Sequence, residues 1–133
     1  MEVSYLVFRI TFALTMAYAH GLPKLINYSS LVDRFPDPIG WGSQVSLTLA
    51  MGAELFAALF VAFGLFTRLM SIPLIITMVV AFFIHHAADP FAQRELAFLF
   101  MMGFVGTFIG GSGHYSLQNF FRLSAGKFSW WLR

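Results

Sequence analysis

Apolar residues fill most of four long stretches of the chain, and polar residues gather between these stretches. A helix needs about 20 residues to cross the hydrocarbon core of a bilayer. The pattern therefore predicts four membrane-spanning helices joined by polar links. We expect the spans at about residues 3–22, 44–66, 69–87 and 95–109.

The links between the predicted spans differ in length. Residues 26–43 form a long link, and the prolines and glycines of its "FPDPIGWGS" segment argue against a further span. The other two links are short, so neighbouring helices are expected to run antiparallel. We predict one domain over residues 1–133, an all-α membrane protein built as a four-transmembrane-helix bundle. Residues 112–133 contain two tryptophans and are expected to form a C-terminal tail at the membrane interface.

The composition supports a membrane protein. Hydrophobic residues make up 59% of the chain and charged residues only 11%, whereas soluble proteins average about 25% charged residues. The net charge of +2 is too small and too scattered for a nucleic-acid-binding surface, so no nucleic-acid partner is expected. The absence of cysteine excludes disulfide and dithiol chemistry within the chain.

The distribution of lysine and arginine predicts the orientation in the membrane. Basic residues near span ends tend to remain in the cytoplasm. On the side of the N-terminus these residues are Arg68, Arg122, Lys127 and Arg133. The opposite side has fewer basic residues and four of the six acidic residues. We therefore expect both termini in the cytoplasm.

Two charged residues fall inside predicted spans. Arg9 is expected near the cytoplasmic side of the first span, and Glu54 near the middle of the second. At about 1.5 Å of rise per residue, their depths differ by roughly 5 Å. Charged groups inside membranes usually pair with one another. We interpret Arg9 and Glu54 as a structural ion pair that fixes the bundle, with a proton or ligand site as the alternative.

A second group of polar residues is predicted near the external membrane face. His20 ends the first span, and Lys24 lies one turn further. The third span ends in two adjacent histidines, whose side chains point about 100° apart on a helix. His85 shares its face with smaller residues, so we expect it to point inward. The predicted layer contains His20, Lys24, His85 and Glu95, while His86 and Arg94 are expected to face headgroups, loop or a partner.

Three kinds of role fit this layer. It suits a quinone head group, to which histidine and glutamate supply hydrogen bonds and proton transfer. Haem held by His20 and His85 is an alternative that the pattern favours less than quinone. A metal is a further alternative, although no compact metal-ligand motif is present and no metal-ligating residues are assigned. The same residues also fit an interfacial polar cap, satisfied by water, headgroups and loop carbonyls.

The order of several short motifs resembles that of the DoxX family of small bacterial membrane proteins. The motifs are "HGLPKL", "FPDPIGWGS", "GLFTRL", "RELAFLF" and "GGSGHYSLQ". The chain looks most like the versions found in Bacteroidetes-type bacteria. The resemblance implies a multi-pass four-helix bundle in the bacterial inner membrane. The positions that match are Arg9, His20, Lys24, Glu54, Glu95 and Arg68, the last in a cytoplasmic turn.

The chain departs from the family pattern near the end of the last motif. His114 and Gln118 stand where a basic residue and an aspartate are common. This departure weakens any special role for the segment. We interpret "GGSGHYSLQ" as a glycine turn that ends the fourth span.

Two functional hypotheses follow. The resemblance implies links to membrane oxidoreductase complexes, so the first is an integral subunit of a redox-linked, quinone-associated complex; whether it is an enzyme stays open. The alternative is a non-enzymatic accessory or assembly subunit, which stabilises a larger complex through its phenylalanine-rich surface. Both imply contact with the lipid bilayer and with membrane or periplasmic proteins, and both are compatible with a homo-oligomer. A transporter would need oligomerisation, because four helices leave little room for alternating access.

Overall fold

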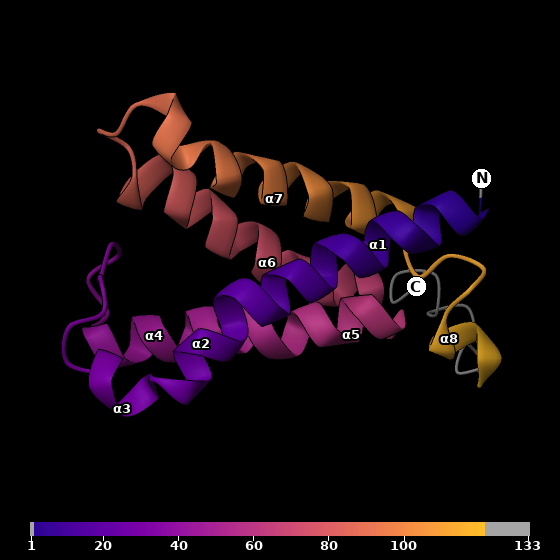
Figure 1. Cartoon of the computed structure of the whole chain (residues 1–133), viewed down its shortest axis with the longest axis horizontal. Helices are drawn as coiled ribbons and strands as arrows, with labels where there is room; N and C mark the ends of the chain where they lie inside the picture. Colours follow the sequence, from indigo (N-terminus) through magenta and orange to yellow (C-terminus); the bar gives the residue numbers. More distant parts are fainter. Residues whose placement is uncertain (1, 122–133) are drawn as a thin grey trace.

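The computed structural model describes residues 2–121, and this part of the chain is helical without any strand. Four long helical segments form the body of the molecule (Figure 1). The first is continuous and consists of α1 (Glu2–Met16), the π-helical η1 (Ala17–Gly21) and α2 (Leu22–Ile26). The short α3 (Tyr28–Leu31) and a loop follow.

The remaining segments follow in chain order. The second consists of α4 (Ser43–Met51), the π-helical η2 (Gly52–Ala57) and α5 (Ala58–Phe63). The third consists of α6 (Thr67–Val80) and the π-helical η3 (Ala81–His85), and the fourth is α7 (Phe91–Gly110). A glycine-containing turn then leads to the short α8 (Leu117–Phe120).

Three of these segments are long and apolar enough to cross a membrane: Ser43–Phe63, Thr67–His85 and Phe91–Gly110. They confirm the second, third and fourth predicted spans. The last begins before its predicted start at residue 95, directly after Pro90, whose extended backbone ends the preceding loop. The first segment carries three charged residues and is not among the three. Its role as a fourth span therefore remains a prediction.

Small residues let the first two segments approach closely. Gly21 of η1 has no room for a side chain, because a Cβ there would lie 2.6 Å from the backbone of Glu54. The elements η1 and η2 are in contact at this point, and α1 contacts α5 further along. The alanines buried in the core are Ala13, Ala17, Ala53, Ala57, Ala58 and Ala62. Close packing over small side chains is typical of helices within membranes.

Aromatic rings of α1 pack onto a row of glycines on α7. A Cβ at any of these glycines would collide with a ring or crowd it: Phe12 at Gly103, Phe8 at Gly106 and Tyr5 at Gly110. Glycines spaced by three and four residues share one face of a helix. They therefore form a continuous groove that sets the position of α1 on α7.

The two ends of the molecule differ in how closely the helices converge. At one end the α6–α7 hairpin lies apart from α2 and α4, and the loop before α4 extends toward it (left in Figure 1). At the other end the start of α1 lies near the end of α7 and near α8 (right in Figure 1). The polar side chains of the bundle gather at these two ends.

Candidate functional site

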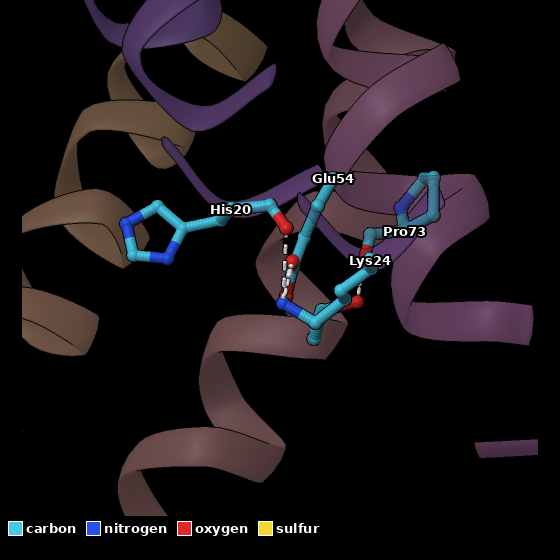
Figure 2. Close-up of polar contacts among 5 residues, drawn as sticks. His20, Lys24, Glu54 and Pro73 are labelled. Atoms are coloured by element: carbon cyan, nitrogen blue, oxygen red, sulfur yellow. Dashed lines mark hydrogen bonds and ion pairs between the residues drawn. The ribbon is translucent and has the colours of Figure 1, made fainter. Parts of the chain in front are cut away.

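Lys24 and Glu54 form an ion pair inside the bundle. The Lys24 ammonium donates to Oε2 of Glu54 and, at 3.2 Å, to the carbonyl oxygen of His20 (Figure 2). The side chains are only 18% and 7% exposed, respectively. The predicted Arg9–Glu54 pair is therefore wrong, because Glu54 is paired with Lys24 and Arg9 binds elsewhere. A lysine side chain is long enough to reach inward from a helix end while its stem packs on apolar surface.

Three of the four long segments each contain one π-helical turn. His20 lies in η1, Glu54 in η2 and His85 in η3. A π turn closes its hydrogen bond over five residues instead of four, so it widens the helix and rotates the residues that follow. Faces and depths calculated for a regular α-helix are shifted beyond such a turn. π turns are frequent at functional sites.

A cavity of about 350 Å³ opens beside the ion pair. One wall comes from α4 and η2, the other from α6 and η3, and the loop before α4 adds a third side. Lys24, Glu54 and His85 supply the titratable groups, and most of the remaining lining is apolar. The volume lies within the range of small-molecule sites, which are mostly apolar with a few placed polar groups.

The structure divides the predicted external layer. Lys24 and His85 both line the cavity. His20 does not, because its ring turns away from the ion pair (Figure 2) and lies edge-on to Phe100 of α7, with 5.5 Å between the ring centroids. His20 thus contributes its carbonyl oxygen to Lys24 rather than its imidazole to the cavity. The two histidine rings considered for haem do not share this site.

The fourth predicted member, Glu95, is exposed on α7 and does not line the cavity. Its neighbour Arg94 turns inward instead, with its guanidinium carbon 4.8 Å from the centroid of the Phe82 ring. The expected orientations of Arg94 and Glu95 are therefore reversed. The contact with the Phe82 ring holds Arg94 against η3, while Glu95 is exposed. His86 contacts the hairpin loop as predicted, with Nδ1 2.6 Å from Oδ2 of Asp89.

Arg9 lies at the other end of the bundle and is 2% exposed. Its guanidinium donates to the carbonyl oxygens of Ser112 and, at 2.9 Å, Tyr115. Both acceptors belong to the "GGSGHYSLQ" segment, which follows α7. The segment therefore closes over a buried cation, and its interpretation as a simple helix-ending turn was incomplete.

Gln118 completes the closure and was missed in the sequence. Its Oε1 accepts hydrogen bonds from the Phe66 N–H and from the Ser112 hydroxyl, both at 3.0 Å. This carbonyl fastens the last motif to the start of α6. No local pattern in the sequence indicated this contact, because it joins residues 52 positions apart. Arg68 also lies at this end and donates to the carbonyl of Ile109 at 3.2 Å.

The described residues offer no group of three or more histidine, cysteine, aspartate or glutamate side chains placed to hold a metal ion. The chemistry available at the cavity is hydrogen bonding and proton exchange by one ammonium, one carboxylate and one imidazole. Thr77, which also lines the cavity, already donates its hydroxyl to the carbonyl of Pro73 at 2.8 Å (Figure 2). Lys24 and His85 are therefore the titratable donors available to a ligand.

The fold, with its three long apolar helices, defines a multi-pass membrane protein. The DoxX family profile matches residues 4–87, which is more than half of the chain, and the chain belongs to the DoxX family. The matched region includes Lys24, Glu54 and His85 together with all three π turns. Comparisons with curated proteins and with solved structures gave no match.

Proposed function

We propose that the protein is an integral membrane subunit of a quinone-associated redox complex, and that the cavity beside Lys24 and Glu54 takes the quinone head group. The observation that carries this proposal is the convergence of an ammonium, a carboxylate and an imidazole on one apolar cavity between membrane-spanning helices. Intramembrane ionisable residues around a cavity commonly mark ligand or proton pathways. Membership of the DoxX family agrees with a redox-linked role.

The donors in the cavity suit the carbonyl groups of a quinone. A lysine ammonium has three N–H groups, and two of those on Lys24 bind Glu54 and the His20 carbonyl. The third is available to donate to one quinone oxygen, and the imidazole of His85 is available to the other. Apolar walls then pack against the ring.

Proton exchange is the second task of the same residues. Reduction of a quinone to a hydroquinone takes two electrons and two protons. A partner subunit supplies the electrons, and Glu54 and His85 exchange the protons with the head group. In this proposal His20 positions Lys24 through its carbonyl oxygen, and Glu95 lies outside the reacting layer.

The proposed topology places this cavity near the external face. The first segment serves as a fourth span of a single domain, and both termini lie in the cytoplasm. The interfacial tail expected over residues 112–133 falls largely on residues 122–133, which lie outside the described residues. The proposed membrane is the bacterial inner membrane. The distribution of basic residues near span ends supports the proposed orientation. Partner proteins contact the subunit within the membrane or on its periplasmic side.

The test is purification in native membrane nanodiscs, followed by mass spectrometry of bound small molecules. We expect a quinone in the wild-type preparation and its loss in His85→Ala, which removes an exposed side chain and leaves the ion pair in place. Glu95→Gln is the matched control, because it changes a titratable residue outside the cavity, and it should retain the quinone. Quinone retained equally by all three proteins would refute this site.

A second candidate function is that of an accessory subunit without chemistry of its own. The observation in its favour is the number of exposed phenylalanines on the described helices, among them Phe56, Phe60, Phe63 and Phe83. Aromatic side chains are enriched where proteins meet, and a homo-oligomer would use the same surface. Unchanged activity of the host complex with His85→Ala and Lys24→Met would favour this function.

A further inference from the structure

The loop before α4 presents two different sides. Five of its residues, Phe35, Pro36, Pro38, Ile39 and Trp41, line the cavity. Asp37 lies in the middle of this apolar run but is not part of the lining. Its carboxylate turns instead toward the start of α4. The loop therefore covers the cavity with apolar side chains. It is fastened to the start of α4 by the Asp37 carboxylate and by the Ser43 hydroxyl, which donates to the Phe35 carbonyl at 2.8 Å.

Asp37 makes three hydrogen bonds at this position. Its Oδ1 accepts from the Trp41 N–H at 2.9 Å and from the Ser46 hydroxyl at 2.8 Å, and its Oδ2 accepts from the Gly42 N–H at 2.7 Å. The N-terminus of a helix also attracts negative charge. Gly42 adopts a positive φ of 97°, which a residue with a side chain would rarely adopt. The backbone and the carboxylate thus hold one defined loop conformation.

Another side of the cavity, between α4 and α6, faces the surrounding lipid. Leu49 on α4 and Ile76 on α6 both line it, and they are 52% and 56% exposed. Both residues lie well inside candidate membrane spans. Their exposed surfaces therefore meet lipid chains, and the cavity has an apolar mouth between α4 and α6.

We infer that residues 35–42 form a roof that closes the cavity toward water, that Asp37 is its positioning residue, and that ligands reach the cavity from the bilayer. The class of ligand follows from this route. It carries a polar head group for Lys24 and His85 and a hydrocarbon tail that leaves between α4 and α6. The identification of the head group as a quinone rests on the proposed function, whereas the route of access does not.

Because the chain has no cysteine, the access of reagents to the cavity can be measured by labelling a single introduced thiol. Ala50→Cys places one thiol on the cavity wall, and Ser29→Cys places one on an exposed position of α3. Each protein is reconstituted in lipid nanodiscs, which leave both faces open to reagents. It is then labelled with a membrane-impermeant sulfonated maleimide or with a lipid-soluble maleimide.

We expect the lipid-soluble reagent to label both thiols, and the sulfonated reagent to label Ala50→Cys at least about tenfold more slowly than Ser29→Cys. Adding Asp37→Ala to Ala50→Cys should raise labelling by the sulfonated reagent about tenfold or more, since hydrogen bonds to a charged acceptor are lost. Ser46→Ala removes one of the three bonds and should give a smaller increase. Asp33→Ala, at an exposed aspartate of the same loop, should leave the rate unchanged.

Rapid labelling of Ala50→Cys by the sulfonated reagent in the otherwise unchanged protein would overturn the inference. So would a rate that neither Asp37→Ala nor Ser46→Ala alters. Thermal unfolding of each variant shows that the measured access belongs to a folded protein. The labelling experiment does not involve quinone. If the thiol is protected but the purified protein contains no quinone, the roof is supported and only the proposed quinone function is refuted.

Discussion

The two ends of the bundle each hold a cation in an apolar setting, and they satisfy it in different ways. Arg9 binds two backbone carbonyls of a segment that closes over it. Lys24 binds the carboxylate of Glu54 beside a cavity of about 350 Å³. Backbone carbonyls cannot exchange protons at neutral pH, whereas a carboxylate can. This difference supports the proposal that the Arg9 end is structural and that the Lys24 end takes a ligand.

The largest effect is expected when Arg9 is replaced. Arg9→Met removes two hydrogen bonds from a charged donor and leaves the carbonyls of Ser112 and Tyr115 without it. Such bonds contribute roughly 1.5–3 kcal/mol each, so we expect a loss of about 3 kcal/mol or more in the free energy of unfolding. The measurement is thermal unfolding and monodispersity in detergent. A variant that remained as stable as the wild type would show that the segment is not held by Arg9.

Variants of the Lys24–Glu54 ion pair should allow its contribution to stability to be measured separately from its contribution to quinone binding. Lys24→Met leaves Glu54 buried without a partner, and we expect a loss of about 2 kcal/mol, below the usual value for a buried pair because Lys24 is partly exposed. The double variant Lys24→Met with Glu54→Gln should recover most of this stability. Quinone binding should be lost in both, as measured by mass spectrometry of nanodisc preparations. Binding retained by the double variant would mean that the pair serves only the fold.

Gln118 offers a milder test of the structural end. Gln118→Ala removes the acceptor for the Phe66 N–H and the Ser112 hydroxyl, and we expect a loss of about 1–2 kcal/mol. Ligand binding at the far cavity should not change. Gln93→Ala, at an exposed position of α7, is the matched control for stability. Reduced ligand binding with Gln118→Ala would show that the two ends are coupled.

The smallest expected effect concerns pH at the roof. The hydrogen bond from the Gly42 N–H, followed by that from Ser46, holds the pKa of Asp37 below its ordinary value of 3.8. The carboxylate therefore stabilises the closed loop above that value, and this contribution is lost as the pH falls through the lower folded pKa.

Trp41 reports on this change when Trp130 and Trp131 are replaced by phenylalanine. We expect quenching of its fluorescence by iodide to stay constant from roughly pH 7 to pH 5 and to rise only below about pH 4. Asp37→Asn should remove the rise at low pH. A rise near pH 6 in the protein that retains Asp37 would instead point to a histidine.

The sequence predicted the helical class and three of the spans because long apolar stretches have few other solutions in a chain with so little charge. Lys24 and His85 were predicted in one polar layer and both line the cavity, but the His85 side chain is exposed, whereas it was expected to point inward. The partner of Glu54 was wrong because Arg9 binds the carbonyls of Ser112 and Tyr115, whereas Lys24, from beyond the predicted end of the first span, reaches inward to Glu54. Gln118 was missed because its contact with Phe66 joins residues 52 positions apart, for which no local pattern exists.

Photoaffinity labelling with an azido-quinone tests the central claim most directly. The protein is labelled in nanodiscs, and the modified peptides are identified by mass spectrometry, with and without an excess of unlabelled quinone. We expect labelling at residues that line the cavity, such as Trp41, Ala50 and Ala81. Excess unlabelled quinone should suppress this labelling, and His85→Ala should abolish it. Labelling confined to the exposed faces of α5 and α7, or labelling that excess quinone does not reduce, would contradict the claim.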